Sequence, residues 1–122
     1  MRIVFIGAVA FSARALIELI AMQADIVGVC TSEDSGLNSD FEDLKPIAER
    51  ADIPIWCSPD INSPESHAWI SELNPDVIFC FGWSRLIRKP LLTLAPLGVI
   101  GFHPAELPAN RGRHPIIWAL VL

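Results

Sequence analysis

The chain contains 122 residues, of which 52% are hydrophobic and 19% charged, and its formal net charge at pH 7 is −5. This length suits one domain with a well-buried core, and the hydrophobic share excludes a largely disordered chain. The negative net charge disfavours a nucleic-acid partner, although a local basic patch would still bind phosphate.

Short apolar runs alternate with stretches of helical periodicity along the chain. In order, we expect a strand over 2–6, a helix over 11–22, a strand over 25–31, a helix over 44–52, a strand over 53–56, a helix over 63–73, a strand over 76–82, a broken helical stretch over 84–95, a strand over 98–103 and the start of a helix over 114–122. Ser12 and Ser63 are the predicted helix caps, and Pro64 suits a first helical position.

This alternation predicts an α/β fold with a Rossmann-like, doubly wound and mainly parallel sheet that carries helices on both faces. In such sheets, ligands bind at the carboxyl ends of the strands, near the point where the strand order reverses. Three segments follow strands at that edge: GAVAFSA (7–13), FGWSRLI (81–87) and HPAELPANRGRHP (103–115).

The cysteines indicate the compartment. Cys30, Cys57 and Cys80 are odd in number and form no CxxC pair, which favours buried free thiols in a reducing environment over a disulfide framework or a zinc site. The opening MRIVFIG lacks the longer apolar core of a signal peptide, and no apolar run approaches the ~20 residues that span a bilayer. We therefore expect a cytoplasmic protein without a bound metal or a membrane partner.

Two of the segments each allow two interpretations. GAVAFSA contains Gly7 but not the GxGxxG of a dinucleotide site, so it is either a tight strand-to-helix turn or a loop whose backbone faces an anionic ligand. His103 is either a general acid or base at the end of a strand or a structural histidine that caps the proline-rich loop. Arg111 and Arg113 either pair with Glu106 at the surface or orient a phosphate-bearing substrate.

The segment HPAELPANRGRHPIIWAL resembles the signature loop of the 10-formyltetrahydrofolate-dependent formyltransferases, which runs Asn-x-His, Leu-Pro and then Arg-Gly-x-x-Pro. The corresponding residues here are 101–103, 107–108 and 111–115. The opening over 2–19 is similar to the start of the methionyl-tRNA and sugar N-formyltransferase branches, and residues 81–87 are similar to the turn that lines the folate pocket. The resemblance covers essentially the whole chain.

The resemblance implies that an amine attacks the formyl carbon of 10-formyltetrahydrofolate, the co-substrate, and that a tetrahedral oxyanion forms. It implies a catalytic role for His103, which would stabilise that charge. It assigns the folate to Gly82, Trp83, Arg85, Leu86 and Ile87. It assigns the acceptor to Ala8, Phe11, Arg111, Gly112 and Arg113.

The chain departs from the family pattern at two points. The family asparagine corresponds to Gly101, which has no side chain to donate a hydrogen bond, and the family aspartate belongs to a loop beyond Leu122. We therefore expect 1–122 to be an N-terminal formyltransferase-like domain that is truncated at its C-terminus and has little or no activity by itself. Turnover of 10-formyltetrahydrofolate and an amino sugar nucleotide by residues 1–122 alone would contradict this expectation.

The formyl acceptor is a separate question. The tRNA-specific branch carries a basic insertion where this chain has the acidic SEDSGLNSDFED (32–43), and ribonucleotide-specific members use a glycine-rich phosphate loop that GAVAFSA lacks. An amino sugar nucleotide is therefore favoured. The alternatives are methionyl-tRNA and a non-catalytic domain that binds folate or nucleotide. The oligomeric state is not defined by the sequence, although an uncovered C-terminal helix is compatible with a homodimer.

Overall fold

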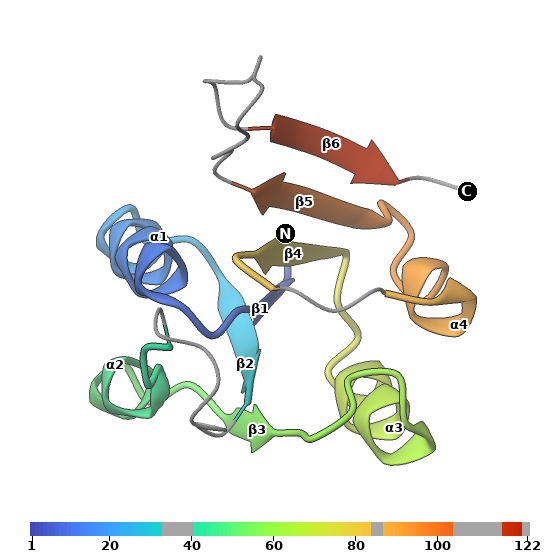
Figure 1. Ribbon diagram of the computed structural model, residues 1–122, viewed down its shortest axis with the longest axis horizontal. Coiled ribbons are helices and arrows are strands. Elements are labelled where there is room, and N and C mark those ends of the chain that lie inside the picture. Colours follow the sequence, from blue (N-terminus) through green and yellow to red (C-terminus); the bar gives the residue numbers. More distant parts are fainter. Residues whose placement is uncertain (33–40, 84–86, 104–115, 121–122) are drawn as a thin grey trace.

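A six-stranded sheet in the order β3-β2-β1-β4-β5-β6 forms the centre of the molecule (Figure 1). The computed structural model describes residues 1–32, 41–83, 87–103 and 116–120. The strands are β1 (Ile3–Ile6), β2 (Ile26–Thr31), β3 (Ile55–Cys57), β4 (Val77–Phe81), β5 (Val99–His103) and β6 (Ile116–Leu120). The first five pair in parallel, and β6 pairs antiparallel with β5.

Helices cover both faces of this sheet. The helices are α1 (Ala10–Ala21), α2 (Lys45–Arg50), α3 (Pro64–Glu72) and α4 (Lys89–Leu92). In Figure 1, α1 and α2 lie on one side of the sheet and α3 and α4 on the other. The structure thus confirms the predicted α/β class with a Rossmann-like, mainly parallel sheet.

Each face of the sheet has its own apolar core, because successive side chains of a strand point to opposite faces. In β1, Ile3 and Phe5 pack in the cluster that contains Leu16 of α1 and Ala48 of α2. Val4 and Ile6 pack in the cluster that contains Ile70 of α3 and Leu91 of α4. A central strand that is buried on both faces is therefore continuously apolar, as the run over 2–6 predicted.

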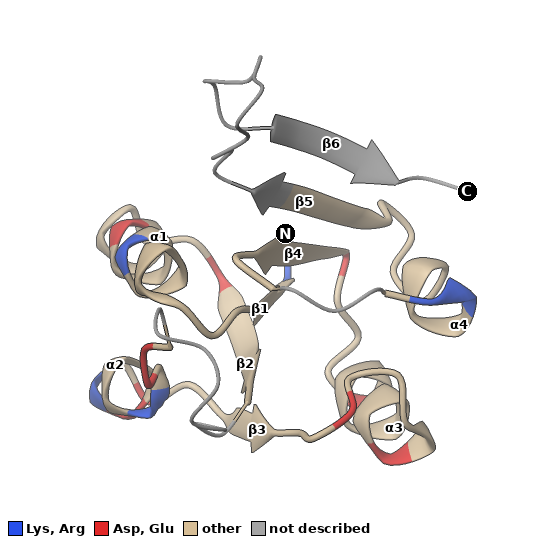
Figure 2. Cartoon of the chain, in the orientation of Figure 1, with Lys and Arg blue, Asp and Glu red and all other residues tan. Residues whose placement is uncertain are grey.

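The charges follow from this arrangement. The described strands contain no Lys, Arg, Asp or Glu, and in Figure 2 the coloured charged residues lie on helices and connections. Among the described helices, none is both long and apolar enough to cross a membrane.

One helix prediction was wrong, and a second stretch holds a shorter helix than expected. Residues 114–122 were expected to begin a helix, but Ile116–Leu120 forms β6, which pairs from His103↔Ile116 to Val99↔Leu120. An apolar run of this length fits a strand as well as a helix, and the free edge of β5 supplies the partner that decides between them. Within the described residues 87–95 of the predicted broken helical stretch, the helix is the single turn of α4, because Pro90 suits a first turn and not a helix interior.

Candidate active site at the β1–β4 switch point

The strand order reverses at β1, which pairs with β2 on one side and with β4 on the other. The chain therefore leaves the carboxyl ends of β1 and β4 toward opposite faces of the sheet, and in doubly wound folds the ligand site lies between two such connections. The turns that follow these strands begin at Gly7 and Gly82, so the predicted segments 7–13 and 81–87 start side by side.

A single hydroxyl group joins the two turns. Ser12 Oγ donates a hydrogen bond to the carbonyl oxygen of Phe81 at 2.6 Å and accepts hydrogen bonds from the backbone N–H groups of Ala8 and Val9 at 3.2 Å each. Ser12 is fully buried. It is not the helix cap that we predicted: the cap of α1 is Val9, and Ser12 is the third helical residue.

Both turns need glycine, because the two backbones approach each other closely. A Cβ atom on Gly7 would lie 2.5 Å from the Phe81 carbonyl oxygen and 2.6 Å from Ser12. Gly82 has φ 73°, a left-handed conformation, and a Cβ atom there would collide with Ser12 Oγ and with Val9. Gly7, Ser12 and Gly82 together form the junction, a name we keep for these three residues.

An aromatic side chain closes one side of the junction. Phe11, predicted to contact the acceptor, is half-buried and stacks on Phe81, with ring centroids 6.3 Å apart and an interplanar angle of 17°. Phe81 in turn stacks on Phe79 at 5.3 Å. Ala8, the other predicted acceptor residue at this turn, is buried. The stacked rings form an apolar wall beside the turn that follows β1, which is the turn predicted to contact the acceptor.

Two further described residues that are predicted to bind folate, Trp83 and Ile87, pack on the opposite face of the sheet from Phe11. Ile87 is buried and Trp83 is partly buried, and both belong to the apolar cluster under α3 and α4. The indole N–H of Trp83 is buried and has no hydrogen-bond partner in the described part of the chain. An unsatisfied buried donor carries a free-energy cost that a bound acceptor group would remove. Arg85 and Leu86 lie outside the described residues.

The third segment meets the same edge through β5. Phe102 pairs with Phe81, and His103 is the last residue of β5, so its backbone lies at the edge that carries Gly82. Gly101 is buried and pairs with Cys80 on one side and Trp118 on the other. The predicted acceptor residues Arg111, Gly112 and Arg113 lie outside the described residues.

The acidic segment ends against the acceptor turn, which the sequence did not indicate. Phe41 forms a β-bridge with Val9, and the N–H of Glu42 donates to the carbonyl oxygen of Ala8 at 3.0 Å. Glu42 and Asp43 are both exposed. Two carboxylates of this segment therefore lie beside the loop that follows β1.

Cys30 and Cys80 are buried free thiols, as predicted, whereas Cys57 is only partly buried. Burial raises the pKa of the Cys80 thiol to about 12. Burial, followed by the neighbouring Cys57 and Cys80, raises the pKa of the Cys30 thiol above its usual range. Because the thiolate is the reactive form, raised pKa values disfavour Cys30 and Cys80 as nucleophiles at neutral pH. Among the described side chains, no group of three His, Cys, Asp or Glu could hold a metal ion.

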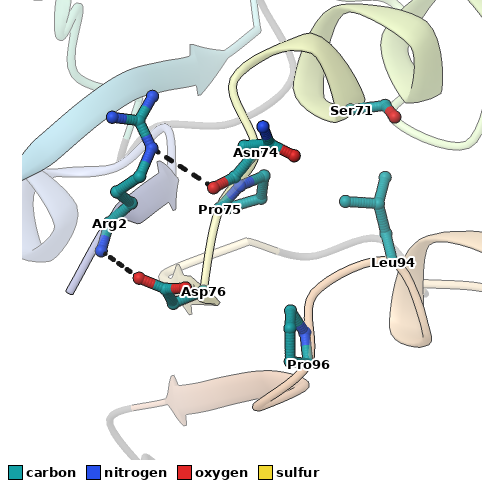
Figure 3. Close-up of a pocket in the computed structure, with 7 residues that line it drawn as sticks. All are labelled: Arg2, Ser71, Asn74, Pro75, Asp76, Leu94 and Pro96. Carbon is teal, nitrogen blue, oxygen red and sulfur yellow. Dashed lines mark hydrogen bonds between the residues drawn. The ribbon is translucent and has the colours of Figure 1, made fainter.

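A pocket of about 450 Å³ lies at the opposite edge of the sheet, near the amino ends of β1 and β4 (Figure 3). Its arginine is occupied by structural contacts. The Arg2 guanidinium donates to the carbonyl oxygens of Leu73, at 2.7 and 3.0 Å, and of Asn74, at 3.2 Å, and its backbone N–H donates to Asp76 at 2.7 Å. These bonds satisfy carbonyl groups at the C-terminus of α3, so the pocket belongs to the scaffold.

The chain is similar in sequence to proteins of one known family. A family model described as formyl transferase matches residues 1–121. Methionyl-tRNA formyltransferases from Desulfotalea psychrophila and Thermotoga maritima are 34% and 33% identical over 99% and 95% of this chain. The chain spans only 39% and 38% of their lengths.

Solved structures give the same fold. A phosphoribosylglycinamide formyltransferase from Bacillus halodurans aligns with a TM-score of 0.68 and 18% identity, over 93% of this chain and 61% of that one. One from Brucella melitensis aligns with a TM-score of 0.61 and 25% identity, over 92% and 61%.

The junction predicts the effect of removing its hydroxyl group. Ser12→Ala should lower the free energy of unfolding by about 1–3 kcal/mol, because the buried N–H of Ala8 and the Phe81 carbonyl oxygen lose their partner. Urea unfolding measures this change. Ser71→Ala, at an exposed serine of α3, is the matched control and should change stability by less than about 0.5 kcal/mol. Equal stability of the two variants would contradict the role of Ser12.

Proposed function

This chain belongs to the formyl transferase family, and we propose that it supplies the site at which the formyl group of 10-formyltetrahydrofolate passes to a primary amine. The observation that carries the proposal is the junction. It joins the turn assigned to the acceptor to the turn assigned to the folate, with His103 at the same edge of the sheet. Reacting groups held on two such turns would meet between them.

The roles of the individual residues follow from their positions. Trp83 and Ile87 would hold the folate, and the indole N–H of Trp83, which no described group accepts, would donate to a polar group of that ligand. Phe11 would form an apolar wall beside the amine. His103 would donate a hydrogen bond to the oxyanion, a task that Gly101 cannot share through a side chain.

Replacing the histidine tests this assignment. In the whole protein, His103→Ala should lower kcat by about 100-fold or more, as expected when one oxyanion donor is lost. The KM for 10-formyltetrahydrofolate should change little. His67→Ala, at a partly exposed histidine of α3, serves as the control and should leave kcat unchanged.

The same assay separates the enzyme from its alternative. If the protein is a non-catalytic domain, it would bind a folate analogue without any turnover. If the His103→Ala variant keeps the kcat of the wild type, the histidine has no part in the mechanism.

For the acceptor, we propose an amino sugar nucleotide. The supporting observation is the position of Glu42 and Asp43 beside the acceptor turn. Carboxylates at this place repel a long polyanion such as tRNA more strongly than a single nucleotide. Methionyl-tRNA is the second candidate, because the curated relatives in the comparison are methionyl-tRNA formyltransferases.

A parallel assay distinguishes the two acceptors. The whole protein should formylate an amino sugar nucleotide and not charged initiator tRNA. Glu42→Gln with Asp43→Asn should leave the rate with the sugar nucleotide almost unchanged. If the protein instead formylates only the tRNA, and the double substitution accelerates that reaction at low salt, the acceptor is methionyl-tRNA and the proposal is wrong.

A further inference from the structure

A second side-chain contact holds the far end of the predicted folate segment. Asn62 Oδ1 accepts a hydrogen bond from the backbone N–H of Arg88 at 2.8 Å, across 26 residues of sequence. Arg88 is the N-cap of α4 and directly follows Ile87. Asn62 therefore fixes the point at which the backbone passes from Ile87 into α4.

The loop that carries Asn62 is itself well ordered by hydrogen bonds. The hydroxyl groups of Ser58 and Ser66 lie 2.6 Å apart, and Trp56 Nε1 donates to Ser66 Oγ at 2.9 Å. Ser66 Oγ also donates to the carbonyl oxygen of Asp60 at 2.9 Å, and the Asp60 carboxylate accepts from the N–H of Asn62 at 3.0 Å. A connected polar network of this kind restricts the backbone, so Asn62 presents its oxygen from a fixed position.

Apolar packing supports the same contact. Ile61 is 2% exposed and Ile87 is 7% exposed, and both belong to the cluster that contains Ile70 and Leu91. The residues that adjoin Asn62 and Arg88 in the sequence are therefore buried in one core. The hydrogen bond and the apolar cluster hold α3 and α4 together at this point.

We infer that Asn62 is a positioning residue for folate binding, an inference that depends on the proposed function. Ser12 holds the start of the segment at Phe81, and Asn62 holds its end at Arg88. A folate ligand that packs on Ile87 meets a residue whose backbone is already held in place at the adjoining Arg88, so less conformational entropy is lost on binding. Asn62 acts through Ile87 and Arg88 and needs no contact with the folate.

The test compares the affinities of Asn62 variants of the whole protein for 10-formyl-5,8-dideazafolate by titration calorimetry. Asn62→Ala should raise Kd roughly two- to tenfold, because the N–H of Arg88 loses the side-chain oxygen that accepts its hydrogen bond. The KM of the amine acceptor should stay unchanged. Asn62→Asp keeps an acceptor oxygen for the N–H of Arg88 and should bind the analogue more tightly than Asn62→Ala does. Asn62→Leu keeps the volume and replaces Asn62→Ala if that variant is unstable.

The matched control is Thr93→Val, which removes the hydrogen bond from Thr93 Oγ1 to the Lys89 carbonyl oxygen at the other end of α4. It should bind the folate analogue as wild type does. The inference is wrong if Asn62→Ala and Asn62→Leu bind the folate analogue with the affinity of the wild type. It is also wrong if Thr93→Val weakens binding as much as they do. Absence of binding by the wild-type protein would instead overturn the proposed function, and the inference with it.

Discussion

The hydroxyl group of Ser12 joins the carboxyl ends of the two central strands. It bonds to the backbone of the turn after β1 and to the last residue of β4, and it is fully buried. This contact brings the two backbones so close that Gly7 and Gly82 have no room for a side chain. These three residues therefore fix the distance between the two turns at the switch point of the sheet.

The candidate site is therefore built mainly from backbone held by small polar side chains. Ser12 anchors one end of the predicted folate segment and Asn62 the other, and each side chain belongs to a helix or connection on a different face of the sheet. The acidic segment is attached to the acceptor turn through the backbone of Phe41 and Glu42. Chemistry on such a scaffold would depend on position more than on unusual pKa values.

Much of the fold was predictable because buried parallel strands have a distinctive pattern. The runs at Ile3–Ile6 and Val77–Phe81 are apolar throughout, and Ser63 with Pro64 correctly indicated the start of α3. Residues 116–120 were assigned to the wrong class, since their apolar character is equally suited to a helix. The site assignments at Gly82, Trp83, Ile87 and His103 remain predictions that the geometry supports.

The sequence by itself determined the succession of strands and helices along the parallel part of the chain, the burial of Cys30 and Cys80, and the family. These depend on local patterns and motifs. Only the tertiary structure decided the role of Ser12, the attachment of Glu42 and the contact between Asn62 and Arg88. The side chains of residues such as Ser12 and Asn62 can form hydrogen bonds with many backbone groups close by in the sequence. The packing of the helices on the sheet decides which distant backbone group each one contacts, and a local sequence pattern does not contain that information.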